Sequence, residues 1–264
     1  MSLIICIVSV NGKLEIKKDT VSESLRNLTY KIIKENMNGY NCLLWLSEKN
    51  AKYPVNLASQ DFPLPVLSSD TSSQLDKIIV DVFKLQCKGY LIQTPDPGYF
   101  LKLWELERQV SIDRHSPRMI FLPWNDTVPN SNNLFRLPET QFHCDLLLIE
   151  INGRTTGENN FFNIVTNNFY TPFDQENRKP GLLLGVWPID TNIDFFPDKI
   201  FNLEGKTIRT GIIQYPPFTI VEPFGGVEPN VVQIFCEIHN CSIAAVTDNH
   251  LWGEIWENKS GNGM

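Results

Sequence analysis

The sequence lacks any long apolar run. A membrane-spanning helix needs roughly 20 consecutive apolar residues, whereas the longest apolar stretches here, such as Leu3–Val10 and Leu182–Trp187, have the length of strands. Basic residues are also in the minority, because 23 Lys and Arg stand against 30 Asp and Glu, and the formal net charge is −7. This balance argues against the basic surface on which nucleic-acid binding depends, so we predict no nucleic-acid partner.

The usual signatures of catalysis are missing as well. The chain contains neither a G-x-S-x-G nucleophile elbow nor a G-x-x-x-x-G-K-[ST] phosphate loop. Glu105 and Glu107 fit a solvated helix face. Cys236-x-x-His239-x-Cys241 groups residue types that bind metals, but a structural zinc site needs four ligands. That cluster is better explained by a buried cysteine and a surface histidine at a helix end. We therefore predict no enzyme activity, no cofactor and no metal site.

The six cysteines are irregularly spaced along a long chain. Such spacing is not typical of a disulfide framework. A secreted chain of this size can carry one or two bridges, and the sequence does not pair them. Cys42, Cys87 and Cys144 adjoin apolar runs of strand length, which favours burial as packing residues.

Two features bear on secretion. Residues 1–12 contain the stretch Leu3–Val10, which fits either the apolar part of a signal peptide or the first buried strand of an α/β domain. The glycosylation sequence N-x-[ST] occurs at four asparagines, which are Asn27, Asn125, Asn240 and Asn258. One of them falls on a predicted helix and another precedes a cysteine, so the favoured acceptors are Asn125 and Asn258.

Helical and strand patterns alternate between residues 20 and 122. Capping sequences begin at Thr20 and Thr71, each followed by apolar residues at helical spacing. A third helical pattern runs from Tyr99 to Val110. Apolar runs of strand length lie at 41–46, 90–93 and 118–122. This alternation predicts an α/β domain with a parallel sheet and helices on both faces.

The pattern changes in the middle of the chain. Cys144–Ile151 and Leu182–Trp187 are predicted strands. The Asn-, Thr- and Gly-rich segment between them, Gly153–Pro180, is interpreted as a long loop or irregular insert. The best domain boundary falls within Thr191–Gly205, which divides the chain into an α/β region at 13–198 and a second region at 199–264.

The second region opens with a predicted strand at Thr207–Tyr215, in which adjacent Ile212 and Ile213 indicate burial on both faces. The pair Pro216–Pro217 must end that strand, because proline cannot donate to a ladder. After the flexible Gly225–Gly226, an apolar stripe at helical spacing comprises Val231, Ile234, Phe235 and Ile238. A further strand at Ser242–Val246 completes the pattern of a parallel βαβ unit.

The residues of this second region resemble the ligand-binding domain of ionotropic glutamate receptors, and more narrowly the insect ionotropic receptors. The motifs that carry the resemblance are Leu203-x-Gly205-Lys206-x-Ile208-Arg209, Tyr215-Pro216-Pro217-Phe218, Gly226, Trp252-Gly253 and Asn262-Gly263-Met264. Each motif alone is weak, and their order and spacing together make the match specific. The resemblance implies that residues 199–264 open the first lobe of a clamshell related to periplasmic solute-binding proteins. It further implies that residues 13–198 form a reduced amino-terminal domain.

The resemblance also carries functional expectations. In this family an aromatic residue at the position of Trp252 covers the ligand, and the residue at Tyr215 lies at the mouth of the cleft. Glutamate receptors usually carry an acid where this chain has Tyr215, so an amino-acid ligand is disfavoured. The chain is then expected to be an amino-terminal, extracellular fragment of a chemosensory ligand-gated cation channel in the plasma membrane. It would sense a small odorant-like molecule beside other receptor subunits, and the second lobe and the pore would lie outside it.

Two other classes of protein remain open. A soluble small-molecule binding protein of the periplasmic type would share the clamshell without a channel. An α/β enzyme would assemble its site from residues scattered along the sequence. The residues that follow Met264 in the complete protein would separate a channel from a binding protein, and a bound metal or cofactor would indicate an enzyme.

Overall fold

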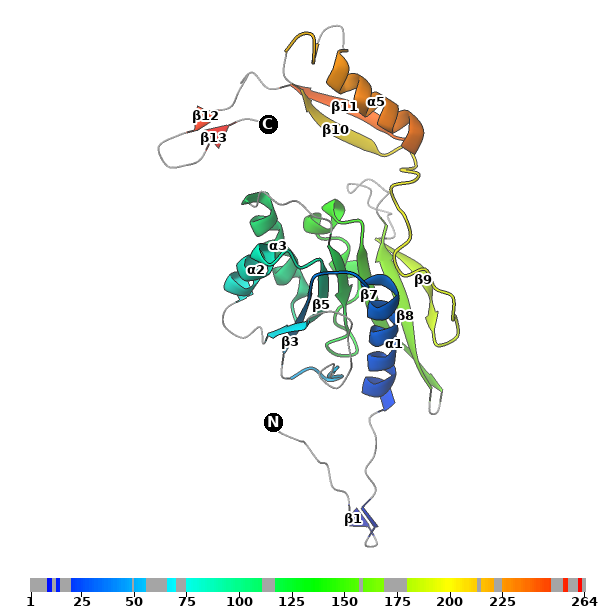
Figure 1. Cartoon of the computed structure of the whole chain (residues 1–264). Coiled ribbons are helices and arrows are strands. Elements are labelled where there is room, and N and C mark those ends of the chain that lie inside the picture. The colour runs from blue at the N-terminus through cyan, green and yellow to red at the C-terminus, as the bar shows by residue number, and fades with distance from the viewer. Residues whose placement is uncertain are drawn as a thin grey trace. The chain divides into compact units, whose positions relative to one another are not determined.

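The computed structural model describes residues 9–10, 13–14, 20–48, 50–55, 66–69, 75–110, 117–156, 159–168, 180–212, 215–220, 225–247, 254–255 and 261–262. The chain divides into two compact units (Figure 1). The first unit comprises residues 1–167 and 179–196, and the second comprises 168–178 and 197–264. None of the helices described has both the length and the apolar character needed to cross a membrane.

A mixed seven-stranded sheet forms the centre of the first unit. Its strands are β3 (Leu43–Ser47), β4 (Val66–Ser69), β5 (Gly89–Gln93), β6 (Arg118–Phe121), β7 (Leu146–Thr156), β8 (Asn159–Asn167) and β9 (Gly181–Trp187). They lie in the order β4-β3-β5-β6-β7-β8-β9. Neighbours from β4 to β7 are parallel, and the pairs β7–β8 and β8–β9 are antiparallel. The predicted parallel α/β sheet is confirmed for its first five strands.

Helices cover both faces of this sheet, as the alternating sequence pattern predicts. The three long helices are α1 (Thr20–Asn36), α2 (Leu75–Lys84) and α3 (Pro97–Val110). In β5, Tyr90 and Ile92 pack into one core with α2 and α3, while Leu91 packs into a second core with α1. Strands β6 and β7 alternate in the same way. Because successive side chains of a strand point to opposite faces, continuous apolar runs here mean burial on both sides.

Much of the Asn-, Thr- and Gly-rich segment that begins at Gly153 belongs to the sheet. The interpretation of Gly153–Pro180 as an irregular insert is therefore wrong for its first half, which forms the end of β7 and the whole of β8. Its polar residues find partners within the sheet. Asn152 donates to the side-chain oxygen of Asn163 across the pair at 3.0 Å, and the Thr166 hydroxyl donates to the Leu146 carbonyl at 2.6 Å. Paired polar groups can be buried at little cost.

A disulfide joins Cys42 to Cys87, with their Cα atoms 4.9 Å apart. Each cysteine lies just before one of two neighbouring parallel strands, since Leu43 of β3 is paired with Gly89 of β5. The sequence left room for one or two bridges without pairing them, and the register of this strand pair is what brings the two sulfurs together. Both residues are buried, as the sequence indicated.

The second unit contains a smaller sheet of two parallel strands. Its elements are β10 (Thr207–Ile212), α5 (Val227–His239) and β11 (Ser242–Thr247). The register pairs Thr207 with Ser242 and Ile212 with Thr247. The predicted parallel βαβ unit is therefore confirmed. A second disulfide, Cys236–Cys241, joins the end of α5 to the residue before β11. The two cysteine sulfurs of the Cys236-x-x-His239-x-Cys241 cluster are therefore bonded to each other.

Burial in the second unit differs from the sequence-based expectation. Strand β10 is not buried on both faces, because its residues alternate between exposed and half-buried until Ile212, which is 5% exposed. In α5 the predicted apolar stripe lies largely in solvent, with Val231, Ile234 and Ile238 all more than half exposed. The helix buries Pro229 and Cys236 instead. An apolar periodicity identifies a helix, but it does not say what the apolar side will contact.

The remaining elements are short. They are β1 (Ser9–Val10), β2 (Lys13–Leu14), α4 (Ser131–Leu134), the 3-10 helix η1 (Pro138–Phe142), β12 (Glu254–Ile255) and β13 (Gly261–Asn262). Several predicted features lie outside the described residues. These are most of the N-terminal stretch Leu3–Val10, the capping sequence at Thr71, and Ile213.

Candidate functional site

Tyr215 opens a tight turn a short distance beyond the end of β10. We call residues Tyr215–Thr219 the aromatic turn. The N–H of Tyr215 donates to the carbonyl of Thr219, and the N–H of Thr219 donates back to the carbonyl of Tyr215, both at 2.9 Å. The rings of Tyr215 and Phe218 stack with centroids 5.6 Å apart and planes 14° apart. About half of each side chain is exposed, at 50% and 47%, so the turn presents a flat aromatic surface to solvent.

The aromatic turn is fastened to the N-terminal end of α5. The Thr219 hydroxyl, on a side chain only 3% exposed, donates to Oε2 of Glu228 at 2.6 Å. The backbone N–H of Glu228 donates to the carbonyl of Phe218 at 3.0 Å. One residue in the first turn of the helix thus holds the turn through both its backbone and its side chain.

Gly226 makes this close approach feasible. Its φ is +104°, in the left-handed region that favours glycine. A Cβ atom at this position would lie 2.5 Å from the carbonyl oxygen of Phe218, which is far inside van der Waals contact. The glycine therefore allows the backbone of the aromatic turn to lie directly against the start of α5.

This arrangement suits recognition of a small molecule better than bond-making chemistry. Stacked aromatic rings offer an apolar face with a hydroxyl at its edge, which can take an apolar or cationic group. The N-terminus of α5 beside them adds partial positive charge, although the N–H of Glu228 is already bonded to Phe218 and Pro229 has no N–H to donate. Glu228 is the acidic residue of that first turn, and its carboxylate is engaged by Thr219.

The predicted ligand contacts are only partly described. Tyr215 lies exposed in the aromatic turn, and Trp252 lies outside the described residues. The sequence analysis did not single out Phe218, Thr219 or Glu228 as site residues. Phe218 could have been found, since it belongs to the same proline-rich motif as Tyr215. The pairing of Thr219 with Glu228 has no signal in the sequence.

The four predicted glycosylation asparagines differ in their surroundings. Asn125 lies in the loop after β6, where its side-chain oxygen accepts hydrogen bonds from the N–H groups of Thr127 and Val128 and from the Thr127 hydroxyl. Asn27 is exposed on α1, but the hydroxyl of Thr29 in its sequon is buried and donates to the Leu25 carbonyl at 2.8 Å.

The other two asparagines are Asn240 and Asn258. Asn240 is the left-handed C-cap of α5 with φ +52°, between the two bridged cysteines, and its amide donates to Asn202 at 2.9 Å. Asn258 lies outside the described residues.

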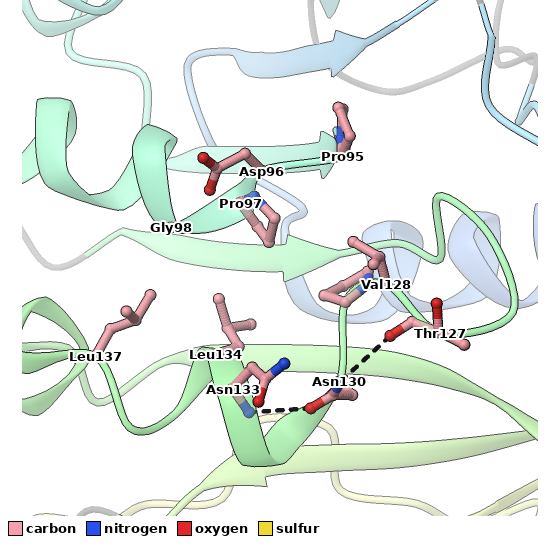
Figure 2. A pocket seen from close by; sticks show the side chains of 11 residues that line it. Pro95, Asp96, Pro97, Gly98, Thr127, Val128, Asn130, Asn133, Leu134 and Leu137 are labelled. Atoms are coloured by element: carbon pink, nitrogen blue, oxygen red, sulfur yellow. Dashed lines mark hydrogen bonds between the residues drawn. The ribbon is translucent and has the colours of Figure 1, made fainter.

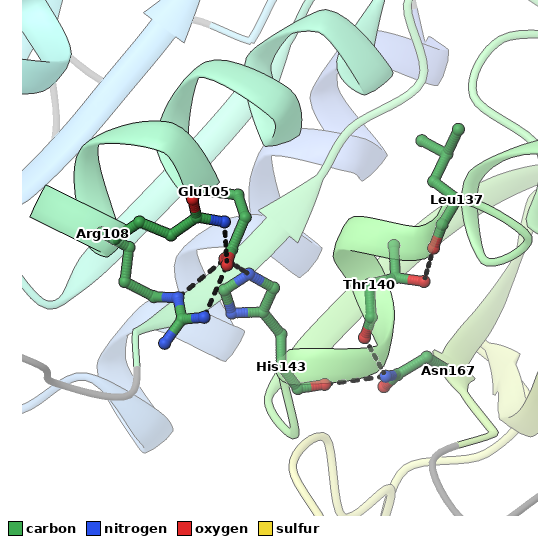
Figure 3. A network of polar contacts seen from close by, with 7 residues as sticks. Glu105, Arg108, Leu137, Thr140, His143 and Asn167 are labelled. Carbon is green, nitrogen blue, oxygen red and sulfur yellow. Dashed lines mark hydrogen bonds and ion pairs between the residues drawn. The ribbon is translucent and has the colours of Figure 1, made fainter. Parts of the chain in front are cut away.

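A buried polar network in the first unit was missed by the sequence analysis. Glu105 does not lie on a solvated helix face, because it is 6% exposed and forms two hydrogen bonds with the guanidinium of Arg108 at 2.5 and 2.7 Å. Nε2 of His143 lies 3.7 Å from the Glu105 carboxylate (Figure 3). Asn167 ties this region to β8 by donating to the His143 carbonyl at 2.8 Å. Spacing alone could not reveal the histidine, which directly follows η1 and stands 38 positions after Glu105 in the printed sequence.

The pKa values of Glu105 and His143 in this network are both below their ordinary values. Burial by itself would raise the pKa of Glu105, but the hydrogen bonds and charge of Arg108 outweigh it and hold that pKa below its usual range. Burial lowers the pKa of His143 to about 4, against the opposing attraction of Glu105. The ring of Trp104 packs edge-on against the imidazole at 4.7 Å. At neutral pH the network is an ion pair beside a neutral histidine, with the carboxylate and the imidazole both buried, which favours a structural role.

Among the described residues, no three His, Cys, Asp or Glu side chains gather where they could hold a metal ion. The aromatic turn is the candidate ligand-binding site of the second unit. Known proteins provide no further identification: no protein-family model matches this chain, and no curated protein is significantly similar to it.

Proposed function

We propose that this chain forms an extracellular, ligand-recognising part of a chemosensory ligand-gated cation channel of the insect ionotropic receptor kind. Residues 199–264 would begin the first lobe of a clamshell like that of periplasmic binding proteins. Residues 13–198 would form a reduced amino-terminal domain. The channel would contain further subunits and respond to a small odorant-like molecule.

The observation that carries this proposal is the aromatic turn in its place within the parallel βαβ unit. In α/β proteins ligands bind beyond the carboxyl ends of parallel strands, where helices begin. Tyr215 follows the carboxyl end of β10, and Glu228 fastens the turn to the start of α5. The motif that suggests the family therefore coincides with the part of the second unit that is best suited to hold a small ligand.

The exposed side of α5 supports a larger lobe. Val227, Val231, Ile234 and Ile238 recur at helical spacing and are 57%, 63%, 55% and 68% exposed. Full burial of one such side chain stabilises a protein by about 1.5–3 kcal/mol. A stripe of four favours a helix that is covered in the working protein, and in the proposed receptor the rest of the lobe would cover it.

The two disulfides support the extracellular placement. Such bonds persist in oxidising compartments and are rare in reducing ones. One bridge lies in each unit, at Cys42–Cys87 and at Cys236–Cys241. Both units are therefore consistent with a secreted or extracellular domain.

The complete coding sequence provides the first test. The proposal expects the reading frame to continue after Met264 into a second stretch of α/β sequence and several apolar helices. A complete protein without apolar helices would contradict the channel and favour a soluble binding protein. Sequencing the full transcript measures this directly.

A response assay then tests the aromatic turn. The full-length receptor, expressed with its partner subunits, would be challenged with a panel of small odorants while the membrane current is recorded. Tyr215→Ala should abolish or strongly weaken the response, because it removes half of the stacked pair. The matched control is Phe201→Ala, an exposed aromatic of the same unit outside the turn, at 76%. Equal responses from the two variants would contradict a role for the aromatic turn in ligand binding.

A further inference from the structure

The first unit contains a pocket of about 230 Å³ at the carboxyl edge of its sheet (Figure 2). One wall is the link from β5 to α3, which includes Pro95, Asp96 and Pro97. The opposite wall comes from the loop after β6 and from α4 and the residue Leu137 beyond it. The pocket therefore lies beyond the carboxyl ends of two adjacent parallel strands, where small ligands bind in open α/β sheets. It lies wholly within the first unit and is separate from the aromatic turn.

The interior of the pocket is mainly apolar. Figure 2 shows the side chains of Leu134 and Leu137 directed toward Pro97 and Gly98. Val128 and Pro129 add further apolar surface. Liquid water takes up about 30 Å³ per molecule, so a pocket of this size can take an organic molecule of roughly eight heavy atoms.

Some polar groups of the pocket already form hydrogen bonds within the protein, and others do so only in part. The side-chain oxygen of Asn130 accepts from the N–H of Asn133 at 3.0 Å, and its amide donates to the Thr127 carbonyl at 3.2 Å. One carboxylate oxygen of Asp96 accepts from the N–H of Tyr99 at 2.9 Å and caps α3. The second oxygen of Asp96 and the exposed side chain of Asn133 are the groups available to a ligand.

Asp96 is the one residue with a formal charge among those that line the pocket. The N-terminus of α3 opposes it, because a helix N-terminus carries roughly half a positive charge. The carboxylate carries a full negative charge, so the net charge of this wall of the pocket is negative. A cationic ligand is attracted by that balance and an anionic ligand is repelled.

We propose that this pocket binds a small organic cation, namely an ammonium group on a compact apolar body. The ammonium would lie against the carboxylate of Asp96, and the apolar body would occupy the space between Pro97 and Leu137. This inference goes beyond the proposed function, because it assigns a second ligand to the other unit of the chain. It holds whether or not the chain belongs to a channel.

Three ligands of nearly equal size test the charge preference. Benzylamine is cationic at neutral pH, benzyl alcohol is neutral and benzoate is anionic. Binding of each to the purified chain would be followed by calorimetry or by ligand-observed NMR. Benzylamine should bind saturably, benzyl alcohol more weakly, and benzoate the weakest of the three. An order in which benzoate equals or exceeds benzylamine overturns the proposal, as does the absence of saturable benzylamine binding.

Two pairs of variants locate the site. Asp96→Asn keeps the helix cap, because asparagine caps as well as aspartate. It should weaken benzylamine about fivefold, as expected for a solvent-accessible ion pair, and leave benzyl alcohol nearly unchanged. Asn133→Trp should fill the pocket and abolish binding of both. Asn132→Trp, its exposed neighbour on α4, should bind like the unmodified chain. Unaltered benzylamine binding by Asn133→Trp would show that the amine binds elsewhere. Unaltered binding by Asp96→Asn would show that the carboxylate is not involved. Either result overturns the proposal.

Discussion

The carboxylate of Glu105 lies 3.7 Å from Nε2 of His143, and neither side chain is as much as a tenth exposed. Arg108 forms an ion pair with the carboxylate, while the histidine is held neutral by burial. Protonating His143 in the folded protein would place a second cation beside Arg108. The histidine therefore links the stability of the first unit to pH.

The pH dependence has a definite sign. The folded pKa of His143, about 4, lies below its ordinary value of 6.5. Between these two values the unfolded chain binds more protons than the folded chain, so stability falls as the pH is lowered through this window. The loss amounts to about 3 kcal/mol. The lowered pKa of Glu105 adds a further loss only below its ordinary value of 4.5.

Urea unfolding at pH 7 and pH 5 measures this dependence, and Trp104 provides a fluorescent reporter beside the imidazole. His143→Gln removes the titrating group and should flatten the dependence, even though it lowers stability at neutral pH. His239→Gln lies in the other unit and should retain the full dependence. The attribution to His143 fails if His143→Gln and the unmodified chain lose equal stability on acidification.

Gly226→Ala should loosen the aromatic turn from α5. The substitution places a methyl group against the Phe218 carbonyl at a φ that alanine rarely adopts. Strain of this kind costs about 1–3 kcal/mol. Gly205→Ala is the matched control, because Gly205 also has a positive φ of +80° but nothing lies within 4 Å of its added Cβ. Thermal unfolding should show the larger loss for Gly226→Ala, and an equal loss for both would mean that the clash with Phe218 is relieved.

Removing the Cys42–Cys87 bridge should cost more stability than removing Cys236–Cys241. The sequence separations are 45 and 5 residues. A bridge stabilises mainly by restricting the unfolded chain, which gives about 4 kcal/mol for the longer loop and about 2 kcal/mol for the shorter. Double Cys→Ala variants of each pair, compared by denaturant unfolding, check this order. The reverse order would show that strain or residual structure outweighs the entropy of loop closure.

Secretory expression should attach glycans at Asn125 and Asn258 in preference to Asn27 and Asn240. The sequon of Asn125 lies in a loop whose Thr127 is exposed, and such loops are the usual acceptors. Asn125→Gln and Asn258→Gln should each remove one step from the mobility shift produced by an endoglycosidase. Unchanged mobility of Asn125→Gln would place the glycan elsewhere.

The alternation of helices and strands in the first unit could be read from local patterns. The run at 41–46 and the strand at 90–93 contain consecutive apolar residues, and both became central parallel strands with each face covered. The signals for the βαβ unit were equally local, because Pro216–Pro217 follow the first strand, which ends at Ile212, and Gly226 precedes the helix. Such signals for helices and strands depend on residues a few positions apart. They therefore do not depend on where the helix or strand lies in the fold.

Most of the errors concern contacts between distant segments. Glu105 carries no local sign that His143 will lie beside it, although Arg108 stands three positions along the same helix. The missed strand β8 is different, because it contains the apolar pairs Phe161–Phe162 and Ile164–Val165 among its Asn and Thr residues. Cys42 and Cys87 meet only through the register of β3 with β5.

By itself the sequence determined most of the helices and strands, that the chain is α/β, and that Tyr215 stands in a proline-rich turn between a strand and a helix. Only the tertiary structure decided which cysteines are bridged, which acid is buried, and that Glu228 holds the aromatic turn. The physical reason is that secondary structure follows from the periodicity of neighbouring residues, whereas these partners depend on strand register and on how the chain packs after its elements have formed.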